Sequence, residues 1–434
     1  MTRTPAPGDT IVALSSGRPP AAVAIIRTSG PQAFSACEAI AGELPVARRP
    51  SLKSLRAPQD GEVIDRALVL RFDGPGSATG ENIVEYQCHG GRAVVDVLLG
   101  VLTSLPGMRL AQPGEFTHRA FANGRIDLTE AEGLADLLEA ETEAQRKAAL
   151  FAADGGIRRQ VARWSEAVVG LSAQAEAAID YVGDEDETSL DLSQLQGEAD
   201  QIASEIAGWL SRPRVERLKE GVRVVAAGPP NAGKSSLINA LSESDRAIVT
   251  DIPGTTRDVI EIPVGHRGLP FLLIDTAGMR ETGDVVERIG VEKAEAEAER
   301  ADILLWLGNQ CDAPDHSLAL MVHSKADLAG REQAPKGSWP VSVHTGQGLA
   351  DLWTRLHALA ATILPEEGQA ALNRRQSECL EQCRSDLASA STSQDVILVA
   401  HHLSSARMNL DRLTGRSGVE DMLDALFGRF CLGK

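Results

Sequence analysis

A glycine-rich turn near the middle of the chain restricts the fold more than any other feature. Residues 228–236 read GPPNAGKSS, which matches the pattern G-x-x-x-x-G-K-S, and they follow the apolar run 222–227. A helix-like segment, 237–241, comes next. In this order of strand, loop and helix, the backbone N–H groups of the loop can surround a phosphate chain. The segment therefore predicts a phosphate-binding loop, and a plain glycine turn is the alternative.

The side chains of this loop have separate expected tasks. Lys234 is placed to reach the β- and γ-phosphates of a nucleotide, and the Ser235 hydroxyl can ligate Mg²⁺. The nucleotide contacts predicted from the loop are Asn231, Ala232, Gly233, Lys234, Ser235 and Ser236.

Two further motifs follow in the order expected of a nucleotide switch. The first is a loop whose Thr256 would complete the coordination of Mg²⁺, and the second is a strand that ends in D-x-x-G. In the second motif, Asp275 would hold the magnesium shell through water, and the Gly278 N–H would sense the γ-phosphate. The motifs together predict a GTPase whose further nucleotide contacts are Thr250, Asp251, Ile252, Pro253, Gly254, Thr255, Thr256, Asp275, Thr276, Ala277 and Gly278.

The base-reading motif departs from the usual N-K-x-D. Asp327 remains to accept two hydrogen bonds from guanine, and Lys325 remains to stack on the base, but Ser324 replaces the asparagine. We therefore expect guanine selectivity with weaker affinity. Ser342, Val343 and His344 stand where the motif S-A-K is usual. His344 therefore replaces the lysine that usually contacts the base, and its role as a base contact does not follow from the motif.

Composition limits the class of protein. The 434 residues suggest two to four domains, and a net charge of −18 argues against a broad basic surface for nucleic acid. Any contact with RNA must be local or shared with a partner. The N-terminus has no apolar signal-like core, and no apolar run approaches a membrane span, so we expect a cytoplasmic protein. The six cysteines do not form a disulfide framework in such a chain, and Cys379 and Cys383 lack a second pair that would complete a zinc site.

The pattern of elements predicts a multidomain chain. Short strands and two helices make residues 1–116 an α+β domain, and long amphipathic helices make 117–213 the first part of an all-α helical domain. Strands that alternate with helices over 214–369 predict an inserted α/β P-loop GTPase domain with a doubly wound sheet. Residues 370–434 return to helix and form the second part of the helical domain.

The whole set of motifs closely resembles the MnmE (TrmE) family of tRNA-modification GTPases. Besides the GTPase signatures, the resemblance includes three strings: residues 24–30 (AIIRTSG), 79–91 (TGENIVEYQCHGG) and 113–128 (PGEFTHRAFANGRIDL). It extends over essentially the whole length and includes the C-terminal tail that ends in Cys431, Leu432, Gly433 and Lys434.

This resemblance implies a homodimer formed by the N-terminal domain and a complex with an FAD-dependent MnmG-type partner, expected as a heterotetramer. The complex would install a carboxymethylaminomethyl-type group on carbon 5 of the wobble uridine of certain tRNAs, with the one-carbon unit from a tetrahydrofolate. The resemblance assigns Arg27, Glu85, Arg125 and Lys434 to a folate pocket. From the residues alone, Arg27 and Glu85 could simply pair with each other. The family commonly has lysine where this chain has Arg125.

The resemblance also implies catalytic residues and a monovalent ion. Met279, directly after D-x-x-G, has a thioether that cannot orient the attacking water, so another residue must do so. Glu287 stands where the family has its catalytic glutamate. The alternative is that Glu287 is an ordinary solvated glutamate in the first turn of a helix. Cys431 is expected to serve tRNA modification, and a buried, inert thiol is the alternative. A potassium ion is expected to neutralise the charge that develops between the β- and γ-phosphates, with Asn231 among its ligands. The alternative is that Asn231 does not bind the ion and only supports the conformation of the loop. The predicted K⁺ ligands are Asn231, Thr250, Ile252 and Thr255.

Two other functions are compatible with parts of the sequence. A ribosome-assembly GTPase would share every GTPase motif, but it should add a basic RNA-binding domain that this acidic chain lacks. A folate-binding scaffold with a vestigial nucleotide site would explain Ser324, but Lys234, Ser235, Thr256 and Asp275 are all present.

Overall fold

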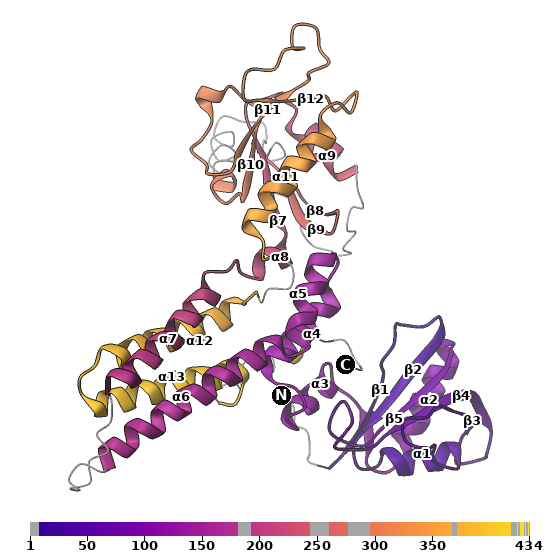
Figure 1. The fold of residues 1–434 in the computed structure, drawn as a ribbon. Coiled ribbons are helices and arrows are strands. Elements are labelled where there is room, and N and C mark those ends of the chain that lie inside the picture. Colours follow the sequence, from indigo (N-terminus) through magenta and orange to yellow (C-terminus); the bar gives the residue numbers. More distant parts are fainter. Residues whose placement is uncertain are drawn as a thin grey trace, which may run out of the picture. The chain divides into compact units, whose positions relative to one another are not determined.

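The computed structural model divides the chain into two compact units (Figure 1). One unit comprises Met1–Ala135 and Thr414–Lys434, and the other comprises Asp136–Leu413. The structure describes residues 8–180, 192–243, 260–276, 296–366 and 371–417, together with positions 423, 426–428, 430 and 433.

The first unit is built on a six-stranded sheet in the order β3-β4-β5-β2-β1-β6. Neighbouring strands are antiparallel except for β1 and β6, which are parallel. The strands are β1 (Thr10–Leu14), β2 (Ala21–Ser29), β3 (Ser51–Arg56), β4 (Val63–Phe72), β5 (Ile83–Gly90) and β6 (Met108–Leu110).

Helices cover both faces of this sheet to different extents. On one face, α1 (Ala33–Ala41) and α2 (Arg92–Ser104) pack their apolar sides against the strands and form the larger core. On the other face, α3 (Glu115–Ala122) contributes Phe116 to a smaller cluster with Ile11 and Ala13. The expected α+β architecture of this region is confirmed.

The strands that sequence patterns missed lie at the two edges of the sheet. The sequence predicts strands at 10–14, 22–26, 67–72 and 82–87 and helices at 31–41 and 93–102. These overlap β1, β2, β4, β5, α1 and α2, but neither β3 nor β6 is predicted. An edge strand such as β3 has a neighbour on one side only and carries mostly half-exposed residues. Its apolar alternation is therefore weak.

Apolar residues recur at helical spacing from residue 128 to 148, which predicts one helix, but the structure has two helices here. α4 (Leu128–Glu139) begins after Asp127, whose Oδ1 accepts a hydrogen bond from the Glu130 N–H at 2.9 Å. α5 (Glu143–Ala153) begins after Thr142, which has an extended backbone and shares a capping box with Gln145. The capping box satisfies backbone donors at the start of α5, so the chain turns at Thr142 although the apolar spacing continues.

The second unit contains a six-stranded sheet in the order β12-β11-β10-β7-β9-β8. Only β8 among these strands is antiparallel to its neighbour. Helices α9 and α11 pack on one face, and Ala298 packs on the other, as in a doubly wound α/β fold. The elements are α8 (Glu216–Glu220), β7 (Val222–Ala227), α9 (Lys234–Glu243), β8 (Ile260–His266), β9 (Leu269–Asp275), β10 (Ile303–Trp306), the 3₁₀ turn η2 (Gln310–Asp312), β11 (Ala319–Ser324), β12 (Trp339–Val341) and α11 (Leu349–Ile363).

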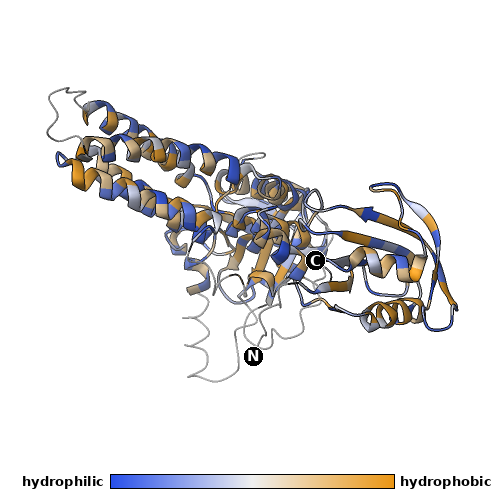
Figure 2. Cartoon of the chain, turned by 90° about the horizontal axis from the view of Figure 1, so that it is seen from below, coloured by the Kyte–Doolittle hydropathy of each residue, from blue (hydrophilic) through white to orange (hydrophobic). Residues whose placement is uncertain are grey.

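Four long helices of the second unit form a bundle. They are α6 (Gly156–Asp180), α7 (Leu192–Leu210), α12 (Arg374–Thr392) and α13 (Val396–Thr414). Figure 2 shows hydrophobic and hydrophilic residues mixed along the long helices of the chain, and the apolar side chains of the bundle meet in one core. Cys383 lies in this core, where burial raises the pKa of its thiol to about 12. Among the described residues, no group of His, Cys, Asp and Glu is arranged to hold a metal ion, and no helix is long and apolar enough to span a membrane.

Helix α5 belongs to two cores at once. Its N-terminal half places Ala144 and Ala148 against the core of the α/β sheet, and its C-terminal half places Phe151 and Ala152 against the core of the bundle. The Ala144 N–H donates to the Gly268 carbonyl at 3.1 Å in the turn between β8 and β9. The Gln145 Nε2 donates to the Leu218 carbonyl of α8 at 2.8 Å. The helix is therefore a fixed link between sheet and bundle.

Replacing Gln145 tests this link. Gln145→Ala removes the hydrogen bond to Leu218 and half of the capping box, which together should lower the thermal unfolding midpoint by roughly 2–6 °C. Gln160→Ala is the matched control, because Gln160 on α6 accepts an exposed hydrogen bond from Arg163. Scanning fluorimetry of both full-length variants measures the difference, and equal midpoints would show that the Gln145 contacts contribute nothing.

Candidate functional site

The turn between β7 and α9 has the backbone of a phosphate-binding loop. Gly228 has φ +143° and Gly233 has φ +93°, values that residues other than glycine rarely adopt. A Cβ at Gly228 would lie 3.2 Å from backbone atoms of Leu307, so the loop also needs glycine for space. Asn231 is left-handed as well, with φ +59°. These angles turn the backbone back on itself between strand and helix, as the sequence predicted.

Lys234 lies within this loop. The residue is only 6% exposed, and its Nζ donates to the carbonyls of Gly228 and Pro229 at 3.0 Å each. An ammonium held at this point provides positive charge where nucleotide phosphates would bind. Ser235 and Ser236 follow in the first turn of α9.

The end of β9 is tied to β7 beside the loop. Asp275 is the register partner of Ala226, and both Asp275 and Thr276 are buried. The Thr276 Oγ1 donates to the Ala226 carbonyl at 2.8 Å. The first two residues of the D-x-x-G motif therefore lie next to the strand that leads into the phosphate loop.

Ser324 keeps a direct connection between the base-reading motif and the phosphate loop. Its Oγ donates to the Ala232 carbonyl at 2.6 Å, and the neighbouring Lys325 Nζ donates to the Asn231 carbonyl at 2.7 Å. A serine hydroxyl has a single proton, whereas an asparagine amide has two N–H donors. The replacement therefore preserves the connection to the loop and leaves no second donor at this position.

Asp327 is held in the ionised form that guanine recognition needs. The buried Ser342 hydroxyl hydrogen-bonds to the Asp327 carboxylate and, together with a backbone hydrogen bond and the nearby His344, keeps its pKa below the ordinary value. An ionised carboxylate can accept two N–H donors at once. Val343 and His344 are exposed beside it. The structure thus brings together the base-reading residues at the ends of β11 and β12.

Several predicted site residues lie outside the part of the chain that the structure describes. They are Thr250, Asp251, Ile252, Pro253, Gly254, Thr255, Thr256, Ala277, Gly278, Glu287, Cys431 and Lys434.

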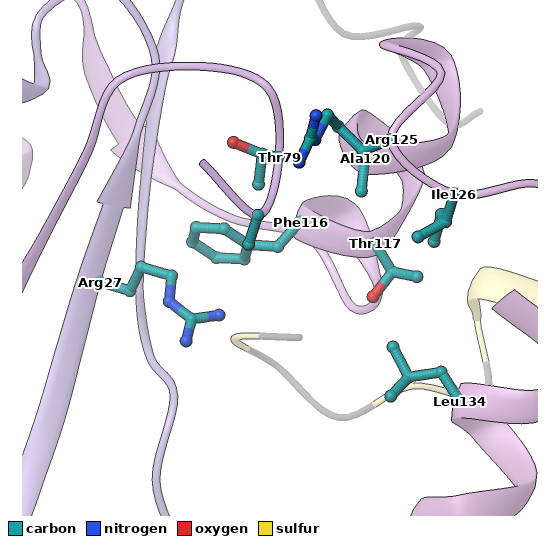
Figure 3. Close-up of a pocket in the computed structure, with 9 residues that line it drawn as sticks. Arg27, Thr79, Phe116, Thr117, Ala120, Arg125, Ile126 and Leu134 are labelled. Carbon is teal, nitrogen blue, oxygen red and sulfur yellow. The ribbon is translucent and has the colours of Figure 1, made fainter. Parts of the chain in front are cut away.

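A second candidate site is a cavity of about 450 Å³ in the first unit (Figure 3). Its lining includes Arg27 from β2, the Phe116 ring from α3 and Arg125 from the turn after α3. Figure 3 shows the Arg27 guanidinium pointing toward the space beside the Phe116 ring. The Arg27 Cζ atom lies 5.7 Å from the centroid of that ring. The full lining is Arg27, Ala78, Thr79, Phe116, Thr117, Ala120, Arg125, Ile126 and Leu134.

Glu85 differs from Arg27 and Arg125 in that it does not line the cavity. Arg27 and Glu85 form an ion pair, with Arg27 Nε 2.9 Å and Arg27 Nη2 2.7 Å from Glu85 Oε1. Glu85 orients Arg27 and is not part of the cavity lining. Phe116 and Thr79 line the cavity but were not predicted, although both lie in motif strings of the sequence. Those strings gave no indication of which of their residues face a ligand.

Comparison with known proteins identifies the family. The family description "GTP-binding protein TrmE N-terminus" matches residues 10–125, and "MnmE helical domain" matches residues 128–431. The protein "tRNA modification GTPase MnmE" of Erythrobacter litoralis (strain HTCC2594) is 50% identical over 98% of this chain and all of that protein. The chain belongs to the MnmE family. Proteins with the same description from Novosphingobium aromaticivorans and Rhizorhabdus wittichii are 48% and 51% identical, each over 98% of this chain and over 100% and 97% of their own length.

MnmE membership settles the general activity. The chain is a GTP-hydrolysing enzyme of tRNA modification, and the alternative of a ribosome-assembly GTPase is not supported. Hydrogen bonds join the phosphate loop, the end of β9 and the base-reading residues, and together these segments form the candidate GTP site. The α+β unit, the helical bundle and the P-loop GTPase fold agree with the predicted multidomain architecture.

The hydroxyl of Ser324 should contribute measurably to GTP binding. Ser324→Ala removes the hydrogen bond to Ala232, so GTP affinity should fall about two- to tenfold, as expected for one neutral hydrogen bond. Ser324→Asn restores a donor and should bind at least as tightly as the native chain. Ser389→Ala is the matched control, because that hydroxyl bonds Ser385 within α12. Titration with a fluorescent GTP analogue decides, and native affinity in Ser324→Ala would contradict this role.

Proposed function

We propose that this GTPase works with an FAD-dependent MnmG-type partner to add a carboxymethylaminomethyl-type group to carbon 5 of the wobble uridine of certain tRNAs. In this proposal the one-carbon unit comes from a tetrahydrofolate bound in the cavity of the first unit. The observation that carries the proposal is that cavity, with Arg27 and Arg125 beside the Phe116 ring, in a chain that also carries a GTP site. The enzyme would act in the cytoplasm, where its tRNA substrates are.

The chemistry of the cavity suits such a ligand. A pterin ring is flat and can lie against an aromatic side chain, and the glutamate tail of a folate carries carboxylates that guanidinium groups bind in a bidentate manner. The cavity offers one aromatic ring, two arginines and largely apolar walls within a volume typical of small-molecule sites. Glu85 would act by holding Arg27 in place, and Lys434 of the C-terminal tail is proposed as a further ligand.

The GTP site is proposed to work with two cations. Ser235 and Thr256 would hold Mg²⁺, and Asn231, Thr250, Ile252 and Thr255 would hold K⁺; both ions supply positive charge next to the phosphates. The fold fits this proposal, because the left-handed backbone of Asn231 is fixed by the Lys325 hydrogen bond at the mouth of the loop. Glu287 is proposed to orient the attacking water.

Exposed apolar residues on the face of the N-terminal sheet opposite α1 and α2 support a homodimer. Leu52 and Leu68 are register partners on β3 and β4 and are 69% and 42% exposed, and Val23 on β2 is 53% exposed. By the alternation along each strand, all three point away from the core that α1 and α2 cover. A second copy of the chain is the proposed cover for this apolar face. A dimer bound to two copies of the partner would give the expected heterotetramer.

Potassium should accelerate hydrolysis. No arginine has been assigned to stabilise the transition state, so an ion next to the phosphate loop should do so, and the rate in K⁺ should exceed the rate in Na⁺ at equal ionic strength by about tenfold or more. Phosphate release at saturating GTP in the two salts measures the effect. Equal rates would remove potassium from the proposal.

Arg125 should be needed for tRNA modification but not for GTP hydrolysis. Arg125→Gln keeps most of the side-chain volume but removes the charge, so affinity for 5-formyltetrahydrofolate should fall about 10- to 100-fold. Mass spectrometry of wobble nucleosides, in cells whose only copy is the variant, should show loss of the carbon-5 group. Arg92→Gln, an exposed change on α2, is the matched control. Normal modification with Arg125→Gln would contradict a folate role for the cavity.

A further inference from the structure

One wall of the cavity is a short turn that is fastened from several sides. Residues 77–81 form this turn, in which Ala78 and Thr79 line the cavity and Gly80 has φ +82°. The Ser77 Oγ donates to the Glu81 carbonyl at 2.5 Å and closes the turn on itself. The Ser29 hydroxyl on β2 lies 2.7 Å from Thr79 Oγ1 and donates to Glu81 Oε2 at 2.7 Å. The turn is therefore attached to the sheet below it.

Helix α3 fastens the same turn from the other side. The Asn123 Nδ2, just after α3, donates to the Thr79 carbonyl at 2.8 Å. Arg119, one helical turn earlier, places its Nη1 3.1 Å from both carboxylate oxygens of Glu81. A Cβ added to Gly80 would lie 2.9 Å from the Asn123 Cβ, so the turn and the helix are already in close contact.

The same helix provides the facing part of the cavity. Phe116, Thr117 and Ala120 line the cavity, whereas Arg119 and Asn123 lie on the adjacent side of α3, at a spacing of four residues. Arg119 is not among the lining residues. Its contact with Glu81 fixes the separation between the helix and the turn, and thus the width of the space between them.

Arg119 is the centre of a larger charged cluster. Its Nη2 donates to Asp9 Oδ1 at 2.8 Å and to Glu115 Oε1 at 3.1 Å, and it is only 11% exposed. Arg109 binds the same two carboxylates from β6. Three carboxylates thus share two guanidinium groups, and loss of Arg119 would leave them with one.

The acidic partners in this cluster are strongly engaged. Burial alone would raise the pKa of Asp9 and of Glu115, but hydrogen bonds from Arg109 and charges of both arginines outweigh burial and lower both pKa values. The carboxylates therefore stay ionised at neutral pH. Stability from these groups is present above their unfolded pKa, near 4, and is lost as the pH falls through the lower folded values.

We propose that Arg119 is a positioning residue for the ligand of this cavity: through Glu81 it holds the turn 77–81 at the distance from α3 that a flat, carboxylate-bearing ligand requires. The proposal rests on the proposed tetrahydrofolate site and adds a residue that does not touch the ligand. Lysine cannot replace it fully, because one ammonium cannot reach Glu81, Asp9 and Glu115 with the fork geometry of a guanidinium.

Two variants test the role without removing the whole cluster. Arg119→Lys keeps the charge but loses the fork. Glu81→Gln removes the charge that Arg119 and Ser29 contact at the turn, while Asp9 and Glu115 keep Arg119 in place. Each should weaken binding of 5-formyltetrahydrofolate, measured by calorimetry on the full-length chain, by roughly tenfold, since small displacements of a binding wall have effects of this size. Arg56→Lys is the matched control, because Arg56 donates to the exposed Gly61 carbonyl away from the cavity.

A purely stabilising role predicts a different set of results. In that case the unfolding midpoint would fall while affinity of the folded protein stayed native. The positioning role predicts lower affinity well below the midpoint, unchanged GTP hydrolysis, and no further loss in the double variant Arg119→Lys with Glu81→Gln. Native affinity in both single variants would overturn the inference. If neither the native chain nor Arg125→Gln bound the folate, the result would instead refute the proposed function.

Discussion

The candidate GTP site depends on a loop that neighbouring elements hold in one shape. Gly228, Asn231 and Gly233 all have positive φ, which glycine adopts freely and which costs energy at Asn231, so contacts from other segments must select this conformation. Three side chains from two segments do so. Thr276 after β9 donates to the Ala226 carbonyl of β7, just before the loop, and Ser324 and Lys325 at the end of β11 donate to the carbonyls of Ala232 and Asn231. Phosphate binding and base reading are therefore parts of one hydrogen-bonded structure.

This arrangement explains why the serine at position 324 is compatible with a working GTPase. The connection between base-reading motif and loop needs one donor aimed at Ala232, and a hydroxyl provides it over a shorter reach than an amide. The position tolerates a smaller polar residue, whereas Asp327 has no equivalent substitute, because only a carboxylate side chain presents two acceptor oxygens side by side to two parallel N–H donors. Ser342 supports that carboxylate in turn.

The two candidate sites use opposite electrostatic designs. At the candidate GTP site, the buried Lys234 ammonium donates to backbone carbonyl groups at the position where nucleotide phosphates would bind. At the cavity of the first unit, the arginine that fixes the wall is saturated by carboxylates of the protein, while Arg125 faces the cavity. Charge used for binding and charge used for architecture are thus carried by different arginines, six residues apart in the chain.

The sequence alone determined those features that depend on neighbouring residues. The strand 222–227 and the loop with its lysine were predicted at their observed positions, because apolar runs and glycine spacing are local signals. Tertiary structure decided the rest. The edge strand β3 depends on what packs beside it, and the Arg119 cluster gathers residues from 9 to 119. Neither spacing nor composition indicates which distant carboxylates an arginine will meet, because only the folded sheet brings them within hydrogen-bonding distance.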